Sequence, residues 1–123
     1  MKILVVDDDP VILKALEIRL TKEGYEVITT LNPNKALEIL KDEDEGQFDL
    51  IISDIVMPYI SGIELLSEIK VASPLTPIIL ISALDQKELI LTAFELGAQD
   101  FVVKPLNLDE LLLRITRYAP KAS

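Results

Sequence analysis

Four short polar strings each complete or follow an apolar run of the chain, and between them they supply carboxylates, a hydroxyl and an amine. The strings are Asp7-Asp8 after 3–6, Asp54 after 50–53, Ser82 after 78–81 and Lys104-Pro105 after 101–103. Because the carboxyl ends of parallel strands converge on one edge of an open α/β sheet, these side chains are expected to meet in one crevice. That crevice would hold three carboxylates, one hydroxyl and one ammonium.

Three carboxylates at one point are electrostatically unfavourable. Like charges in close contact repel each other and raise each other's pKa unless a cation lies among them. Asp7, Asp8 and Asp54 therefore predict a bound divalent metal ion. Since all the available ligands are oxygens, Mg²⁺ is the expected ion.

The elements that position these residues follow from hydrophobic periodicity. Apolar runs alternate with segments of helical period, which is typical of a βα repeat with a parallel sheet. The five predicted strands are 3–6, 26–30, 50–53, 78–81 and 101–103. Most are apolar on both faces, so they are predicted to be central strands covered by helices on both sides.

Five helices are expected between and after the strands. Their predicted extents are Pro10 to Gly24, Pro33 to Asp44, Ser61 as cap through Val71, Gln86 to Leu96, and a last helix capped by Asn107. The predicted buried stripe of the first is Ile12, Ala15, Leu16 and Leu20. Residues 119–123 have no periodicity and are expected to form a frayed end or the start of a linker.

The amino-acid composition excludes several kinds of site and binding function. The 123 residues suit one domain, predicted as 1–118, and the absence of cysteine and histidine excludes disulfides, thiolate sites and imidazole chemistry. A net charge of −9 disfavours direct binding of nucleic acid or anionic membranes. With no signal peptide pattern and no apolar run of membrane-spanning length, a cytoplasmic location is expected.

The ordered set of strand ends, together with the string Asp54-Ile55-Val56-Met57-Pro58 and Gly62, resembles the receiver domain of two-component response regulators. The resemblance covers Met1 to about Tyr118. It implies the flavodoxin-like, doubly wound (βα)₅ fold, a five-stranded parallel sheet with strand order 2-1-3-4-5. The chain is then expected to be a stand-alone regulator or the N-terminal module of a longer protein.

The resemblance implies a role for each metal-site residue. Asp8, Asp54 and the backbone carbonyl of Val56 would hold Mg²⁺, and Asp7 would act through a metal-bound water. Asp54 would be the phosphoacceptor, receiving a phosphoryl group from a phosphohistidine of a histidine kinase or phosphotransfer protein. This donor would dock near the first helix and the loops around Asp54.

The remaining site residues would recognise the phosphoryl group. Lys104, before a cis peptide bond to Pro105, would neutralise the phosphoryl oxygens, and Ser82 would donate its hydroxyl to one of them. Ser82 and Phe101 would form the switch, with the Phe101 ring rotating inward on phosphorylation. Such a protein is a regulator that catalyses only its own phosphorylation and dephosphorylation.

Surplus apolar residues on the last two helices indicate a docking face. We expect the face formed by helix four, strand five and helix five to bind an output partner or a second copy of the chain. The exposed residues predicted there are Leu89, Leu91, Leu96 and Leu113. A harmless scatter of leucines is the alternative.

The sequence also allows predictions for individual residues around the site. Asp9 is expected at the start of the first helix and Asp49 at the surface, neither as a ligand. Tyr59 departs from the family pattern, in which glycine is common, and either gates donor access or only covers the loop. The apolar residues Val56 and Leu84 predict slow self-dephosphorylation.

Two other functions compete. Asp7 and Asp9 also fit the Asp-x-Asp signature of haloacid dehalogenase-type phosphohydrolases, as nucleophile and acid/base. That alternative needs a further acidic strand end after Lys104 and leaves Asp54 without a role. The other alternative is a degenerate receiver that binds partners without being phosphorylated.

Overall fold

The computed structural model describes residues 1–55, 61–83 and 87–118. Strands and helices alternate along the chain. They are β1 (Lys2–Val6), α1 (Pro10–Lys22), β2 (Glu26–Thr30), α2 (Pro33–Lys41), β3 (Leu50–Asp54), α3 (Gly62–Ala72), β4 (Ile78–Ser82), α4 (Lys87–Glu95), β5 (Asp100–Val103) and α5 (Leu108–Thr116). The predicted strands agree with these to within one residue at either end.

The strands form one parallel sheet in the order β2-β1-β3-β4-β5, which confirms the predicted topology. The register aligns the strand ends: Val6 lies beside Ser53 across the β1–β3 pair, and Ser82 lies beside Val103 across the β4–β5 pair. The ends of β1, β3, β4 and β5 therefore lie along one edge of the sheet. The predicted site residues are at or just beyond these ends.

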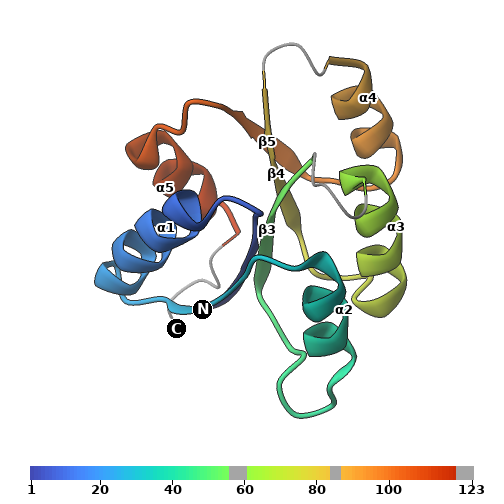
Figure 1. Cartoon of the computed structure of the whole chain (residues 1–123), viewed down its shortest axis with the longest axis horizontal. Helices are drawn as coiled ribbons and strands as arrows, with labels where there is room; N and C mark the ends of the chain where they lie inside the picture. The colour runs from blue at the N-terminus through green and yellow to red at the C-terminus, as the bar shows by residue number, and fades with distance from the viewer. Residues whose placement is uncertain (56–60, 84–86, 119–123) are drawn as a thin grey trace.

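Helices cover both faces of the sheet, with α1 and α5 on one side and α2, α3 and α4 on the other (Figure 1). The core is accordingly divided in two by the sheet. On the α1/α5 side of the sheet, Ile3 and Val5 pack with Leu16 and Ile115. Leu4 lies on the opposite face of β1 and packs with the core residues of α2 and α3. The alternation of side chains along each strand distributes one apolar run between the two layers.

Polar caps set the helix starts. The side chain of Asp9 accepts a hydrogen bond from the backbone N–H of Val11, so the predicted place of Asp9 at the start of α1 is confirmed. Ser61 and Asn107 cap α3 and α5 as predicted. These side-chain acceptors satisfy backbone donors that have no partner within the first helical turn.

The predicted stripe of α1 is partly wrong. Leu13, Leu16 and Leu20 are buried, whereas Ala15 is exposed. The sheet-facing line of a helix repeats at i, i+3 and i+7, and the larger leucines occupy it in preference to alanine. Helix α2 also ends earlier than predicted, at Lys41, because the acidic segment after it folds into turns.

Helix α4 has fewer buried residues than its apolar content would allow. Ala93 is buried and Ile90 is half-buried, while Leu91 is 57% exposed and Leu113 on α5 is 70% exposed. Leu89 and Leu96 are also exposed, so the predicted exposure of all four leucines is confirmed. Phe94 is exposed in part as well.

Within the described ranges, no helix combines the length and apolar character that crossing a membrane requires.

Candidate functional site

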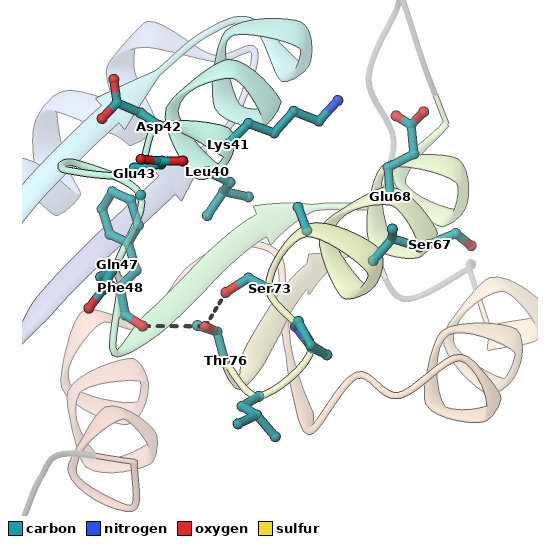
Figure 2. Close-up of a pocket in the computed structure, with 15 residues that line it drawn as sticks. Leu40, Lys41, Asp42, Glu43, Gln47, Phe48, Ser67, Glu68, Ser73 and Thr76 are labelled. Atoms are coloured by element: carbon teal, nitrogen blue, oxygen red, sulfur yellow. Dashed lines mark hydrogen bonds between the residues drawn. The ribbon is translucent and has the colours of Figure 1, made fainter.

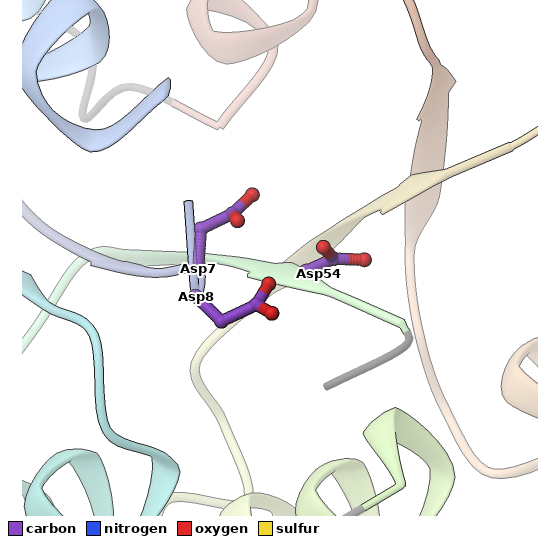
Figure 3. Close-up of side chains that lie close together, drawn as sticks. All are labelled: Asp7, Asp8 and Asp54. Carbon is purple, nitrogen blue, oxygen red and sulfur yellow. The ribbon is translucent and has the colours of Figure 1, made fainter. Parts of the chain in front are cut away.

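Three carboxylates gather at the ends of β1 and β3. Oxygen atoms of Asp7, Asp8 and Asp54 all lie within 4.8 Å of one another. Figure 3 shows the three side chains together, two from the segment after β1 and one from the end of β3. The sequence prediction that these residues converge is confirmed, because adjacent parallel strands end at the same level.

Asp7 is fully buried, in contrast to the exposed Asp8. One carboxylate oxygen of Asp7 accepts the backbone N–H of Asp9 at 2.9 Å, and the other has no hydrogen-bond partner among the described residues. Burial, together with the negative charges of Asp54 and Asp8, raises the pKa of Asp7 to about 6, against the lowering effect of the Asp9 hydrogen bond and the Lys104 charge. The cluster therefore carries unbalanced negative charge.

Lys104 reaches this cluster from the end of β5. Its ammonium donates a hydrogen bond to Oδ2 of Asp54 at 2.9 Å. Burial lowers the pKa of Lys104, but the hydrogen bond to Asp54 and the charges of Asp54, Asp7 and Asp8 outweigh burial and leave that pKa above its ordinary value. The Lys104–Pro105 peptide bond is cis, as the resemblance implied.

Ser82 lies at the end of β4, between Asp54 and Lys104 in the strand order. It is fully buried, and its hydroxyl donates to the carbonyl of Ala83 at 3.0 Å. The backbone N–H of Lys104 donates to the carbonyl of Ser82 at 2.7 Å. This backbone contact couples the ends of β4 and β5, so the positions of the hydroxyl and the amine are linked.

Gly62 holds the segment after Asp54 close to the sheet. Its N–H donates to the carbonyl of Ile55 at 2.8 Å, and a Cβ at position 62 would overlap the Ile55 backbone. Only glycine allows this close approach. The glycine named in the sequence motif therefore has a structural role in placing the residue after Asp54.

The donor set suits a hard divalent cation. Carboxylate oxygens are the ligands that Mg²⁺ prefers, and the second oxygen of Asp7 is buried without a partner among the described residues. A cation in the cluster would relieve the repulsion that raises the pKa of Asp7. The predicted ligand Val56, together with Tyr59 and Leu84, lies outside the described residues.

Comparison with known families gives the same result as this geometry. Residues 3–116 match the response regulator receiver domain. The chain belongs to this receiver family. Receiver domains are phosphoacceptor switches of two-component signalling, and this defines the functional class of the chain.

Known receiver proteins are similar over almost the whole chain. A probable transcriptional regulator, ycf27 of Porphyra purpurea, is 43% identical over 93% of the chain, which spans 45% of that protein. Chemotaxis protein CheY4 of Vibrio cholerae superposes with a TM-score of 0.86 at 31% identity, covering 96% of this chain and 98% of that one. TrrA of Thermotoga maritima, solved in complex with Mg²⁺-BeF, gives a TM-score of 0.81 at 38% identity, with 96% and 98% coverage.

The receiver spans less than half the length of curated relatives such as ycf27. Another relative, a cyclic di-GMP phosphodiesterase of Thermotoga maritima, is 34% identical over 94% of the chain, which covers only 30% of that protein. The named activity of that relative belongs to a much longer protein. The receiver family itself is a phosphoacceptor regulator.

Membership of the receiver family decides against the phosphohydrolase alternative. Asp9 caps α1, and within the described residues no strand follows Lys104. The acid/base and the additional acidic strand end that a haloacid dehalogenase needs are therefore not provided by this part of the chain.

One buried polar group at the opposite end of β5 from Lys104 was not predicted from the sequence. Asp100, at the start of β5, is buried and accepts hydrogen bonds from the Arg114 guanidinium at 2.6 Å and from the Phe101 N–H at 2.8 Å. An acidic residue opening an otherwise apolar strand was the available signal. The pair ties α5 to β5 beside the predicted switch residue Phe101.

Proposed function

We propose that Asp54 is the phosphoacceptor of this receiver. A carboxylate oxygen of Asp54 attacks the phosphorus of a phosphohistidine on a donor protein; the P–O bond forms, the P–N bond breaks, and the histidine nitrogen leaves with the bonding electrons and takes up a proton. Hydrolysis of the acyl phosphate by water returns the carboxylate and inorganic phosphate.

The observation that carries this assignment is the position of Asp54 between the acidic pair and Lys104. A phosphoryl group is strongly anionic, and positioning and charge neutralisation supply most of the catalysis of its transfer. The 2.9 Å ion pair between Lys104 and Asp54 supports the proposal, because the same ammonium would neutralise a phosphoryl oxygen on Asp54. Asp7, Asp8, Asp54 and the Val56 carbonyl would hold Mg²⁺, which when bound neutralises further phosphoryl oxygens.

The test is intact mass spectrometry after incubation with acetyl phosphate and Mg²⁺. Wild type should gain one acid-labile phosphoryl group, and Asp54→Ala should gain none. A phosphoryl adduct that persists in Asp54→Ala, or one located on Asp7, would overturn the assignment. A wild-type protein that never gains the group would instead support the degenerate receiver.

The donor is proposed to be a histidine kinase or phosphotransfer protein that docks over α1. Val11 and Ile18 are 74% and 59% exposed, and with exposed Ala15 they form an apolar stripe at i, i+4 and i+7. The stripe starts beside the acidic cluster. Ile18→Asp should slow transfer from a cognate phosphohistidine protein while phosphorylation by acetyl phosphate is unchanged.

Switching is proposed to involve Ser82 and Phe101. The half-buried Phe101 ring makes an edge-to-face contact with Phe94 of α4, with 5.7 Å between ring centroids. Movement of Ser82 toward the phosphoryl group would leave space for the Phe101 ring and break this contact. Phosphorylation at the sheet edge would thereby change the position of α4.

The output surface is proposed to be the α4–β5–α5 face with its exposed leucines Leu89, Leu91, Leu96 and Leu113. Apolar side chains on this face would bind an output partner or a second copy of the chain. Sedimentation with and without beryllofluoride tests the second case. A monomer under both conditions would leave only the output partner, which a Leu91→Ser variant would then fail to bind.

We propose that the receiver unit comprises residues 1–118; residues 119–123, predicted as a tail or linker, lie outside the described residues. A cytoplasmic location stays a prediction, as do the slow dephosphorylation expected from Val56 and Leu84 and the role of Tyr59.

A further inference from the structure

A groove lies at the opposite end of the sheet from the acidic cluster. It has a volume of about 970 Å³ and is bounded by the end of α2, the α2–β3 connection, the outer face of α3 and the α3–β4 connection. Figure 2 shows these segments surrounding the opening. The groove is therefore separate from the phosphorylation edge and from the α4–β5–α5 face.

The groove has an apolar base and apolar lips. Leu40 and Phe48 are buried at its base, and Val71 and Leu75 are 85% and 94% exposed at its edge. Exposed aliphatic side chains at the mouth of a hollow are unfavourable in water and favour coverage by a partner. A partner must therefore offer apolar side chains to this surface.

The rim is acidic. The residues that line the groove include three carboxylates, Asp42, Glu43 and Glu68, and one ammonium, Lys41. Within the described part of the chain, no salt bridge joins Glu43 or Glu68 to a cation, whereas neighbouring Glu45 is paired with Lys2 at 3.5 Å. Two rim carboxylates are thus available to a cationic partner.

The base of the groove is fixed by hydrogen bonds. The hydroxyls of Ser73 and Thr76 are 2.5 Å apart, and the Thr76 hydroxyl donates to the Phe48 carbonyl at 3.3 Å (Figure 2). These contacts connect the α3–β4 connection to the α2–β3 connection across the groove. A partner would therefore meet a largely formed surface, which reduces the entropy cost of binding.

We propose that this groove docks a cationic amphipathic segment of a partner protein. Leucine-like side chains of the segment would cover Val71 and Leu75, and its arginines or lysines would pair with Glu43 and Glu68. Charge complementarity selects this occupant over a second copy of the chain, since the chain itself carries a net charge of −9. The proposal is independent of the phosphorylation of Asp54.

The probe is a fluorescein-labelled helical peptide of leucine and arginine in amphipathic order, titrated with the complete chain. Fluorescence anisotropy should show saturable binding that weakens with added KCl, and amide NMR shifts should concentrate at 67–76 and 40–48. Two control peptides replace all arginines by glutamate or all leucines by serine. Both controls should bind at least about tenfold more weakly.

Variants localise the binding. Val71→Ser with Leu75→Ser changes only exposed side chains, so the fold is retained, and should weaken probe binding at least about tenfold; Glu68→Lys should do likewise. Leu31→Ser and Glu95→Lys are the controls: the first is a leucine-to-serine change at an exposed site outside every proposed binding face, and the second is the same charge change at an exposed site away from the groove. Neither control should alter affinity.

Three results would overturn the proposal. The first is equal binding of the probe by the groove variants and their matched controls. The second is equal binding of the leucine-free peptide, which would indicate only general attraction to an acidic protein. The third is concentration-dependent self-association of wild type that the Val71→Ser, Leu75→Ser variant abolishes, which would assign the groove to a second copy of the chain.

Discussion

The ammonium of Lys104 lies 2.9 Å from a carboxylate oxygen of Asp54, although the two residues are 50 positions apart in the chain. Both are at the carboxyl ends of strands, and β4 with Ser82 lies between their strands in the sheet. The ion pair brings the Lys104 ammonium to the proposed acceptor. Phosphorylation of Asp54, as proposed, would rearrange this contact.

Replacing Lys104 should slow phosphorylation. In Lys104→Ala, the charge on the phosphoryl oxygens loses one neutralising group, and a loss of roughly a hundredfold in the rate with acetyl phosphate is expected. Time-resolved intact mass measures the rate. Lys35→Ala removes an exposed lysine of α2 and should leave the rate unchanged; equal rates in the two variants would contradict the proposed role.

Asp7 should make the metal-free protein less stable as the pH rises. Its pKa is raised from 3.8 to about 6, so the folded state holds this proton more tightly than the unfolded chain does. The contribution of Asp7 to the free energy of unfolding therefore falls between about pH 4 and pH 6, by about 2 kcal/mol in total.

Asp7→Asn keeps the shape of the side chain without its charge, and should remove this fall. Urea denaturation in EDTA at pH 4.0 and 7.0, on wild type and variant, measures the difference. If Asp7→Asn is no more stable than wild type at pH 7.0, the buried carboxylate is not the source of the repulsion.

Mg²⁺ should stabilise wild type by relieving this same repulsion. Asp8 is exposed, so Asp8→Ala should preserve the fold of the metal-free protein while reducing Mg²⁺ affinity by at least about tenfold. Thermal unfolding as a function of Mg²⁺ concentration gives the affinity. Asp44→Ala, an exposed carboxylate in the α2–β3 connection, is the control, and an identical response of the two variants would refute the assigned ligands.

Gly62→Ala should destabilise the protein. The added Cβ overlaps the backbone of Ile55, so the connection after Asp54 must move, at a cost of about 2 kcal/mol in the free energy of unfolding. Ser67→Ala on the exposed face of α3 is the control. Urea denaturation that gives the same midpoint for both variants would show that the connection adapts without strain.

Arg114 should be the stabilising partner of Asp100. Arg114→Ala would leave the buried Asp100 carboxylate without its 2.6 Å partner, and a loss of roughly 3 kcal/mol is expected. Arg117 is 70% exposed and 4.0 Å from the same carboxylate, so Arg117→Ala should cost far less. Comparable losses for the two variants, measured by urea denaturation, would argue against a specific Arg114 contact.

Much of the fold was predictable because it depends on local patterns. Alternation of apolar runs with helical periods specifies the strands, and side-chain caps such as Asp9, Ser61 and Asn107 mark helix starts. Finer packing was less predictable. Ala15 and Leu13 both fit a helical face, and only the position of α1 on the sheet determines that Leu13 is buried.

The site, like the fold, has features that the sequence predicts and features that depend on packing. Its members were predictable because the carboxyl ends of parallel strands share one edge, whichever side chains they carry. The environment of each member was not. Burial of Asp7 beside exposed Asp8, and the pairing of Asp100 with Arg114, depend on how helices from distant segments cover the strand ends.

The sequence by itself determined the parallel five-stranded sheet, the set of acidic, hydroxyl and amine residues at one edge, and the surplus leucines of α4 and α5. Tertiary structure alone decided the Lys104–Asp54 contact, the burial of the Asp7 carboxylate and the acidic groove between α2 and α3. The physical reason is the distance in sequence over which each interaction acts. Periodicity and capping act within a few residues, whereas desolvation and charge pairing depend on distances between side chains that only the folded chain brings together.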